Sequence, residues 1–247
     1  MKKLIAFDLD DTLAVAKSPI TDQMAEALIK LVDHFHICII SGGKFEQFKI
    51  QVIDRLIIDK DKLKKFHLMP TCGTRYYKYE NDWHEVYAEN LSKDQKVKIE
   101  KLLREAAIEL GYWVEKPYGE IIEDRESQIT LSALGQQAPA DEKYKWDPDG
   151  KKRLEIIDLI SDKLGDLEAR IGGTTSIDVT LPGIDKAYGM KKLMEHLNIK
   201  KEDILFFGDK LTPGGNDYPV KMMGIDSLEV SSWQDTVLAL NSILSIL

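Results

Sequence analysis

The stretch Phe7-Asp8-Leu9-Asp10-Asp11-Thr12-Leu13-Ala14 decides how this chain is interpreted. It follows a short apolar run, Leu4–Phe7, of the kind that forms a buried strand. Asp8 and Asp10 are two residues apart, so in a strand their side chains share one face. Carboxylates placed this way repel each other and need a compensating charge, most simply a divalent cation. Two acids at the carboxyl end of a buried strand therefore predict a catalytic site.

The composition is that of an ordinary globular protein. Of 247 residues, 43% are hydrophobic and 31% are charged, with a net charge of -8. Non-specific nucleic-acid binding relies on a basic surface, so this charge argues against it. Cys38 and Cys72 do not indicate a disulfide framework and are predicted to be reduced. The residues before Asp8 are too few for a signal peptide and no stretch is typical of a membrane span, which predicts a cytoplasmic protein.

Strands and helices alternate at both ends of the chain. Strand patterns at residues 36–41 and 66–72 are accompanied by helical patterns, and a further buried strand is expected at residues 204–207. This alternation predicts a parallel sheet that is covered by helices on both faces.

The middle of the chain follows a different pattern, which is typical of a small antiparallel α+β unit. Its expected elements are an aromatic hairpin at residues 76–87, a helix opened by a capping box at Ser92 and Gln95, strands at residues 120–123, 128–134 and 175–181, and a polar loop that holds Gln136, Lys143 and Trp146. We therefore predict a doubly wound α/β core formed by residues 1–80 and 185–247, with an α+β cap inserted at residues 81–184.

Further groups that could do chemistry follow the predicted core strands. The stretch Ser41-Gly42-Gly43 offers a hydroxyl and open backbone N–H groups, which suit a phosphoryl oxygen. Lys186 opens a helix and is a point charge able to neutralise an anion. Asp209 and Asp217 lie on a glycine-containing loop and offer oxygen ligands of the kind that Mg²⁺ prefers.

In this order the groups resemble the motifs of the haloacid dehalogenase superfamily of phosphotransferases, subfamily IIB. The resemblance implies that Asp8 is the nucleophile, which forms an aspartyl-phosphate, and that Asp10 is the general acid and base. It also implies a phosphate-binding role for Ser41 and a supporting role for Lys186. The implied cofactor is Mg²⁺, with Asp8, Asp10, Asp209 and Asp217 as the expected ligands.

Longer stretches are similar to the eukaryotic-type phosphomannomutase family, at residues 39–46, 176–179, 204–210 and 212–217. In that family, cap arginines hold the distal phosphate of the substrate together with a serine and an aspartate. The resemblance implies this role for Arg125, Ser176 and Asp178. The site is expected at the carboxyl ends of the core strands, under the cap, with Gly42 and Gly43 at the substrate.

Three expected substrate-binding positions depart from that family, because Lys17, Gln136 and Lys143 stand where it has arginines. Lysine keeps the charge but loses the bidentate fork, and glutamine loses the charge. A mutase must bind phosphate at either end of the sugar, so this change affects isomerisation more than hydrolysis. We therefore predict Mg²⁺-dependent hydrolysis of a sugar phosphate or similar metabolite. The alternatives are phosphomannomutase activity and a non-catalytic sugar-phosphate sensor.

Each group taken alone also has a structural explanation. Two acids after a strand are often a solvated turn that caps a helix, and Arg125 alone could form a surface ion pair. The functional interpretation depends on the joint occurrence of the groups, in order, at strand ends. The expected partner is a small phosphorylated substrate, with no nucleic acid and no membrane. Caps of the phosphomannomutase kind can mediate dimers, so a homodimer is a further alternative.

Overall fold

The computed structural model describes residues 2–247, which divide into two compact units. Within the described residues, unit 1 comprises residues 2–88 and 185–247, and unit 2 comprises Glu89–Ile184. The sequence placed the first boundary at residue 81 instead. The difference is strand β5 (Trp83–Ala88), which pairs with β4 (Arg75–Tyr79) in the sheet of unit 1.

The sheet of unit 1 confirms the predicted α/β class. Its strand order is β11-β10-β1-β2-β3-β4-β5, in which neighbours from β11 to β3 are parallel and the β3–β4 and β4–β5 pairs are antiparallel. The parallel strands are β1 (Leu4–Phe7), β2 (His36–Ile40), β3 (Phe66–Met69), β10 (Ile204–Gly208) and β11 (Asp226–Glu229). Parallel strands carry their loops to one edge, so residues that follow β1, β2 and β10 lie at the same edge.

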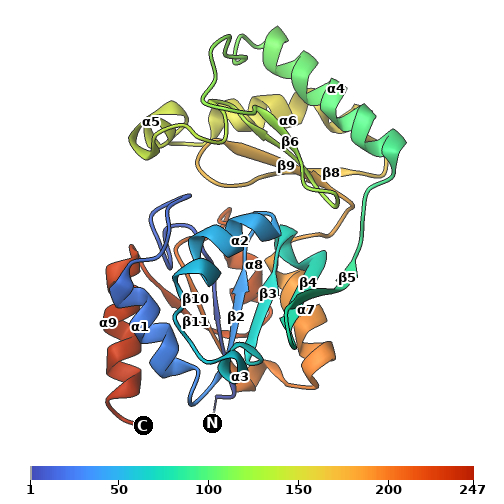
Figure 1. The fold of residues 1–247 in the computed structure, drawn as a ribbon. Helices are drawn as coiled ribbons and strands as arrows, with labels where there is room; N and C mark the ends of the chain where they lie inside the picture. Colours follow the sequence, from blue (N-terminus) through green and yellow to red (C-terminus); the bar gives the residue numbers. More distant parts are fainter. Residues whose placement is uncertain (1) are drawn as a thin grey trace. The chain divides into compact units, whose positions relative to one another are not determined.

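Helices cover both faces of this sheet, as the apolar runs predict. Ile5 and Phe7 of β1 pack with α1 (Asp22–Leu31), α2 (Phe45–Gln51) and α9 (Trp233–Leu244), and α1 lies beside α9 (Figure 1). Leu4 and Ala6 belong to the opposite cluster, with α7 (Lys186–Leu197) and α8 (Tyr218–Met222). A short helix, α3 (Lys60–Leu63), precedes β3. Each large apolar side chain buried this way contributes about 1.5–3 kcal/mol.

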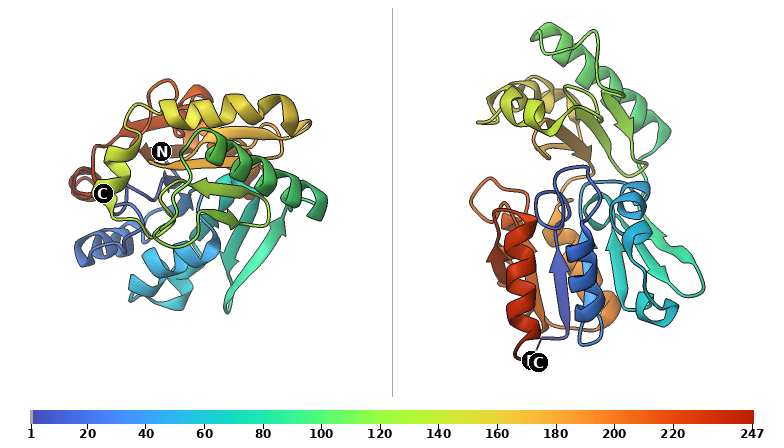
Figure 2. Two further views of the ribbon diagram at one scale, coloured as in Figure 1. Left: turned by 90° about the horizontal axis from the view of Figure 1, so that it is seen from above. Right: turned by 60° about the vertical axis from the view of Figure 1, so that its left-hand side comes forward.

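Unit 2 is an antiparallel sheet with helices on one face. Its strand order is β6-β7-β9-β8, formed by β6 (Ile122–Asp124), β7 (Ile129–Ser132), β8 (Glu168–Ile171) and β9 (Ser176–Thr180). Helices α4 (Lys93–Glu109) and α6 (Lys151–Leu164) pack side by side (Figure 2) and share an apolar cluster with Ile129 and Ile177. The predicted capping box of Ser92 and Gln95 is confirmed at the start of α4.

Two local expectations differ from the structure. The strand expected at residues 66–72 ends at Met69, because Pro70 cannot donate a ladder hydrogen bond and a tight turn follows. The loop expected to hold Gln136 and Lys143 contains a helix, α5 (Ala140–Trp146). Within residues 2–247, no helix combines the length and the apolar character needed to cross a bilayer.

Candidate active site

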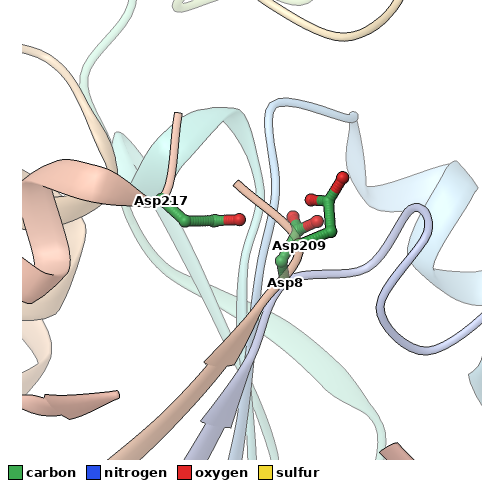
Figure 3. Close-up of side chains that lie close together, drawn as sticks. All are labelled: Asp8, Asp209 and Asp217. Atoms are coloured by element: carbon green, nitrogen blue, oxygen red, sulfur yellow. The ribbon is translucent and has the colours of Figure 1, made fainter. Parts of the chain in front are cut away.

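Three carboxylates meet at the edge of the unit 1 sheet where β1 and β10 end. The two strands are parallel neighbours with Phe7 opposite Phe207, so Asp8 and Asp209 leave the sheet side by side. Asp217 points toward them from the loop that precedes α8 (Figure 3). One oxygen of each of the three carboxylates lies within 4.8 Å of the other two. The structure thus brings together Asp8, Asp209 and Asp217, three of the four residues that were expected to hold a metal ion.

Glycine is required where the Asp217 loop passes β10. A Cβ atom at Gly208 would lie 2.6 Å from Cγ of Asp217, so any side chain there would displace the carboxylate. Asp217 is fully buried, and its Oδ2 accepts a hydrogen bond of 3.1 Å from the backbone N–H of Lys210. The loop is therefore shaped around the Asp217 carboxylate.

A buried lysine joins two of these acids. The Nζ of Lys186 donates to Oδ1 of Asp8 and, at 2.5 Å, to Oδ1 of Asp217, and the lysine is 1% exposed. Asp185 caps α7 by accepting a hydrogen bond of 2.9 Å from the N–H of Tyr188, which places Lys186 at the first helical residue. Lys186 therefore contacts Asp8, the residue that the sequence analysis predicts to be the nucleophile.

Burial of this cluster changes the ionisation of its groups. Burial raises the pKa of Asp8 to about 8; the attraction of Lys186 opposes this, and the charges of Asp217 and Asp209 add to it. Burial raises the pKa of Asp209 to about 6, against the opposing charge of Lys210. Burial disfavours the charged form of Lys186, but Asp217 and Asp8 outweigh it and raise its pKa.

These carboxylates fit a divalent cation. Asp8, Asp209 and Asp217 are three carboxylates against two ammonium groups, those of the buried Lys186 and of the partly exposed Lys210, whose Nζ lies 3.5 Å from Asp209. Carboxylate oxygens are the ligands that Mg²⁺ and Ca²⁺ take, and a cation there would lower the pKa of each acid. The donor set therefore matches the expected cofactor.

The carboxylate of Asp10 is not part of this cluster. Its Oδ1 accepts hydrogen bonds from the backbone N–H of Lys17 at 2.9 Å and from Nε2 of Gln51 at 3.1 Å, and its Oδ2 accepts one from Gln47 at 3.3 Å. Burial opposes ionisation of Asp10, but Lys17, whose Nζ lies 3.6 Å away, and the hydrogen bonds lower its pKa. Its side chain, expected among the metal ligands, instead contacts Lys17 in the loop after β1 and two glutamines of α2.

The sequence analysis did not select Gln47 and Gln51. They are four residues apart on α2 and therefore lie on one face of it. This spacing was the available signal. Gln47 also accepts a hydrogen bond of 2.7 Å from Nζ of Lys17, so the two glutamines hold both Asp10 and the predicted substrate-binding lysine.

The stretch Ser41-Gly42-Gly43 follows β2, which is the other neighbour of β1. Ser41 is 6% exposed, and its Oγ accepts a hydrogen bond of 3.3 Å from the N–H of Gly43. The hydroxyl and the N–H groups thus occupy the same edge of the sheet as Asp8 and Asp209, as predicted.

The other predicted substrate residues lie in unit 2. Arg125 is buried and donates from Nε to Glu123 at 2.7 Å and from a terminal nitrogen to Oε1 of Gln136 at 3.5 Å. Lys143 donates to the backbone carbonyl of Gln136 at 2.9 Å. The structure therefore brings Arg125, Gln136 and Lys143 together.

Ser176 and Asp178 share the polar face of the unit 2 sheet, opposite the helices. The hydroxyl of Thr130 donates to Oδ1 of Asp178 at 2.7 Å, and the hydroxyls of Ser132 and Ser176 lie 3.2 Å apart. Arg170 of β8 is paired in register with Asp178. Thr130 and Arg170 were missed because their relation to Asp178 depends on which strands pair.

Comparison with known proteins places this site in a family. The model of the eukaryotic phosphomannomutase family matches residues 24–246. A phosphomannomutase of Spinacia oleracea is 31% identical over 224 residues, which cover 87% of this chain and 84% of that protein. A probable phosphomannomutase of Caenorhabditis elegans is 29% identical over 230 residues, covering 89% and 86%.

Solved structures share the fold. An IMP-bound, N-terminally truncated IMP-nucleotidase of Plasmodium falciparum aligns with a TM-score of 0.72 at 20% identity, covering 99% of this chain and 68% of that one. A haloacid dehalogenase-like hydrolase of Bacteroides thetaiotaomicron aligns with a TM-score of 0.66 at 17% identity, covering 98% and 100%. These likenesses confirm the predicted haloacid dehalogenase-like fold.

Proposed function

This chain belongs to the eukaryotic phosphomannomutase family, and from that premise we propose that it interconverts hexose 1-phosphate and hexose 6-phosphate. The sequence analysis favoured hydrolysis and gave the mutase as the alternative. The comparisons favour the alternative, because the family match extends over both units and therefore includes the predicted sugar-binding region. An enzyme of phosphatase or mutase type agrees with every relative named above.

The observation that carries the chemistry is the buried contact of Lys186 with Asp8 at the carboxyl edge of the unit 1 sheet. We assign Asp8 as the nucleophile. An oxygen of Asp8 forms a bond to phosphorus while the bond from phosphorus to the leaving oxygen breaks. The ammonium of Lys186 holds the Asp8 carboxylate in place and balances one of the negative charges around the phosphoryl group.

Asp10 moves the proton in this proposal. It donates a proton to the leaving sugar oxygen in the first step, and in the second step it takes one from the sugar hydroxyl that attacks the aspartyl-phosphate. Its low pKa favours the second role, because the carboxylate is ready to accept a proton. Gln47 and Gln51 fix its orientation.

Mg²⁺ is the cofactor we assign to this site, with Asp8, Asp209 and Asp217 as the side chains that would hold it. When bound, it supplies positive charge that stabilises the charge on the transferring phosphoryl group. Ser41 and the N–H groups of the following glycines bind the phosphoryl oxygens in this proposal.

We assign the binding of the second phosphate of the sugar to unit 2. Arg125 and Lys143 supply the positive charges, and Ser176 and Asp178 supply the polar groups of the sheet face. The cytoplasmic location and the homodimer stay predictions. The non-catalytic sensor is disfavoured, because the chain belongs to a family of enzymes and keeps Asp8 in contact with Lys186 and close to Asp209.

Hydrolysis is the second candidate, and Gln136 is the observation that favours it. An uncharged amide lies between Arg125 and Lys143, where the family has an arginine, so the grip on a second phosphate is weaker. Water would then compete with the sugar hydroxyl for the aspartyl-phosphate.

The test is to incubate the purified protein with Mg²⁺ and mannose 1-phosphate, with and without hexose 1,6-bisphosphate, and to follow mannose 6-phosphate and inorganic phosphate. The mutase proposal expects mannose 6-phosphate whose formation depends on the bisphosphate. Release of inorganic phosphate alone would establish the second candidate. If neither mannose 6-phosphate nor inorganic phosphate forms, both candidate functions are overturned.

A further inference from the structure

The turn that follows β3 has an uncommon backbone. Thr71, Cys72 and Gly73 have φ values of 48°, 55° and 84°, so successive residues adopt the left-handed conformation. This conformation is unfavourable for residues with a Cβ atom, and most of all for β-branched threonine. Such a turn persists only where its surroundings hold it, and strain of this kind clusters at functional sites.

One side of the turn holds the phosphate-binding loop assigned above. The N–H of Cys72 donates to the carbonyl of Ser41 at 2.9 Å, and the N–H of Thr71 donates to the carbonyl of Gly43 at 3.0 Å. These carbonyls flank Gly42. The left-handed backbone therefore presents successive N–H groups to the loop and fixes where Ser41 lies.

The other side of the turn is in direct contact with the first turns of α7. A Cβ atom at Gly73 would lie 2.3 Å from Cα of Gly189, and a Cβ atom at Gly189 would lie 2.6 Å from the carbonyl oxygen of Cys72. Real side chains do not approach backbone this closely, so glycine is required on both sides. Gly189 is three residues after Lys186 and lies on the same side of the helix.

We propose that Gly73 and Gly189 are positioning residues that set the separation between Ser41 and Lys186. The Thr71–Gly73 turn is a shared support: its N–H groups hold the phosphate-binding loop, and its glycine lets α7 approach until Lys186 contacts Asp8 and Asp217. A methyl group at either glycine moves the helix away from the turn and the lysine away from the nucleophile. The expected effect of these substitutions on activity rests on the proposed function. Their expected effect on the Thr71–Gly73 turn does not.

Gly189→Ala is the most informative variant. Alanine favours a helix more than glycine does, so a loss of activity cannot come from a weaker α7. We expect kcat for phosphoryl transfer from mannose 1-phosphate to fall about 10- to 100-fold, because small misplacements of catalytic groups have effects of this size. KM should stay unchanged, since the lysine contacts the nucleophile and not the sugar. Amide hydrogen exchange at Thr71 and Cys72 should become faster.

Gly111→Ala is the matched control. Gly111 has a φ of +72°, and an added Cβ atom there would have no neighbour within 4 Å, so this variant introduces left-handed strain without a steric clash. It should keep the wild-type kcat, whereas Gly73→Ala should behave as Gly189→Ala does. Gly73→Ala also keeps the test usable if Gly189→Ala does not fold.

Two outcomes would overturn the inference. One is a wild-type kcat in both Gly73→Ala and Gly189→Ala, and the other is unchanged exchange at Thr71 and Cys72 in both. If the wild-type protein itself transfers no phosphoryl group, the proposed function fails, and the exchange rates alone decide whether the turn supports the helix. Faster exchange in the glycine variants, with Gly111→Ala unchanged, would then still support it.

Discussion

Both units contain buried ion pairs, and the pair of Arg153 in unit 2 differs from the cluster around Lys186 in unit 1 in how the charges balance. In unit 2, Arg153 pairs with Asp147 at 2.7 Å, with side chains 8% and 1% exposed, and it also donates to the backbone carbonyl of Asp147. In unit 1, the ammonium of Lys186 is shared by Asp8 and Asp217, and Asp209 beside them pairs with the partly exposed Lys210 at 3.5 Å, so three carboxylates face two ammonium groups. A balanced pair needs no further ion, whereas an excess of negative charge at a buried site indicates that the site binds a cationic ligand.

The largest effect is expected when the nucleophile is removed. Asp8→Asn should lower turnover of mannose 1-phosphate by at least about 10³-fold, because the amide cannot form the acyl-phosphate. Product formation measures this, and circular dichroism checks that the variant is folded. Asp226→Asn is the control, because Asp226 is an exposed acid at the opposite end of the parallel sheet and should leave turnover unchanged. Turnover in Asp8→Asn near the wild-type level would contradict the assigned mechanism.

The difference in charge balance is tested by removing the cation from each pair. Lys186→Met and Arg153→Met should each lower the free energy of unfolding by about 3–5 kcal/mol, because each leaves buried carboxylate without its partner. Mg²⁺ at 100 times its dissociation constant should restore about 2.7 kcal/mol in Lys186→Met, by binding the acids that have lost their ammonium partner. Urea denaturation with and without Mg²⁺ measures both. Equal recovery in Arg153→Met would remove the distinction between the two units.

A smaller effect is expected from restoring charge in unit 2. Gln136→Arg adds a guanidinium beside Arg125 and Lys143, and should raise the ratio of mannose 6-phosphate to inorganic phosphate about tenfold, since a charged hydrogen bond contributes about 1.5–3 kcal/mol. The neighbouring variant Gln137→Arg changes the net charge equally at an exposed side chain and should leave the ratio unchanged. A ratio that rises in both variants would indicate a general effect of charge.

The smallest effect concerns acid sensitivity, because every histidine of the chain lies in unit 1. Burial, with the charge of His36, lowers the pKa of His67 to about 3. Its unfolded value is near 6.5, so the stabilisation is complete above that pH and is lost as the pH falls toward 3, by about 2 kcal/mol at pH 5. The raised pKa values of Asp8 and Asp209 act in the opposite sense over this range, so the His67 contribution is measured as the difference between the wild-type protein and His67→Gln in hydrogen exchange of β2 and β3 at pH 7 and pH 5. His67→Gln should reduce this loss, whereas His84→Gln, at a half-buried position of β5, should not.

The fold could be predicted where the signal was local. The apolar run before Asp8 and the capping box at Ser92 each depend on a few neighbouring residues, and both are confirmed. Strand β5 was placed in the wrong unit because a hairpin pattern does not say which sheet it extends. Strand β11 was missed because Asp226–Glu229 is a mostly exposed edge strand with little apolar character.

The same distinction explains the site. Asp8, Asp209 and Lys186 could be selected because they follow predicted strands or open a helix, and the parallel sheet then brings such residues together. The surroundings of Asp10 could not be predicted, because its contact with Gln47 and Gln51 depends on how α2 packs against the loop after β1.

The insertion of unit 2 also affects how the chain folds during synthesis. Unit 2 is one continuous segment, Glu89–Ile184, so all its strand pairings are available once that segment has left the ribosome. Unit 1 is different, because β1 pairs with β10. The hydrogen bonds between these strands form only after Ile204, the partner of Leu4, has been synthesised. Pairings of such long sequence separation form slowly, and domains fold as units during translation. We therefore expect unit 2 to fold first, while β1 stays without one of its two neighbours until the last part of the chain is made.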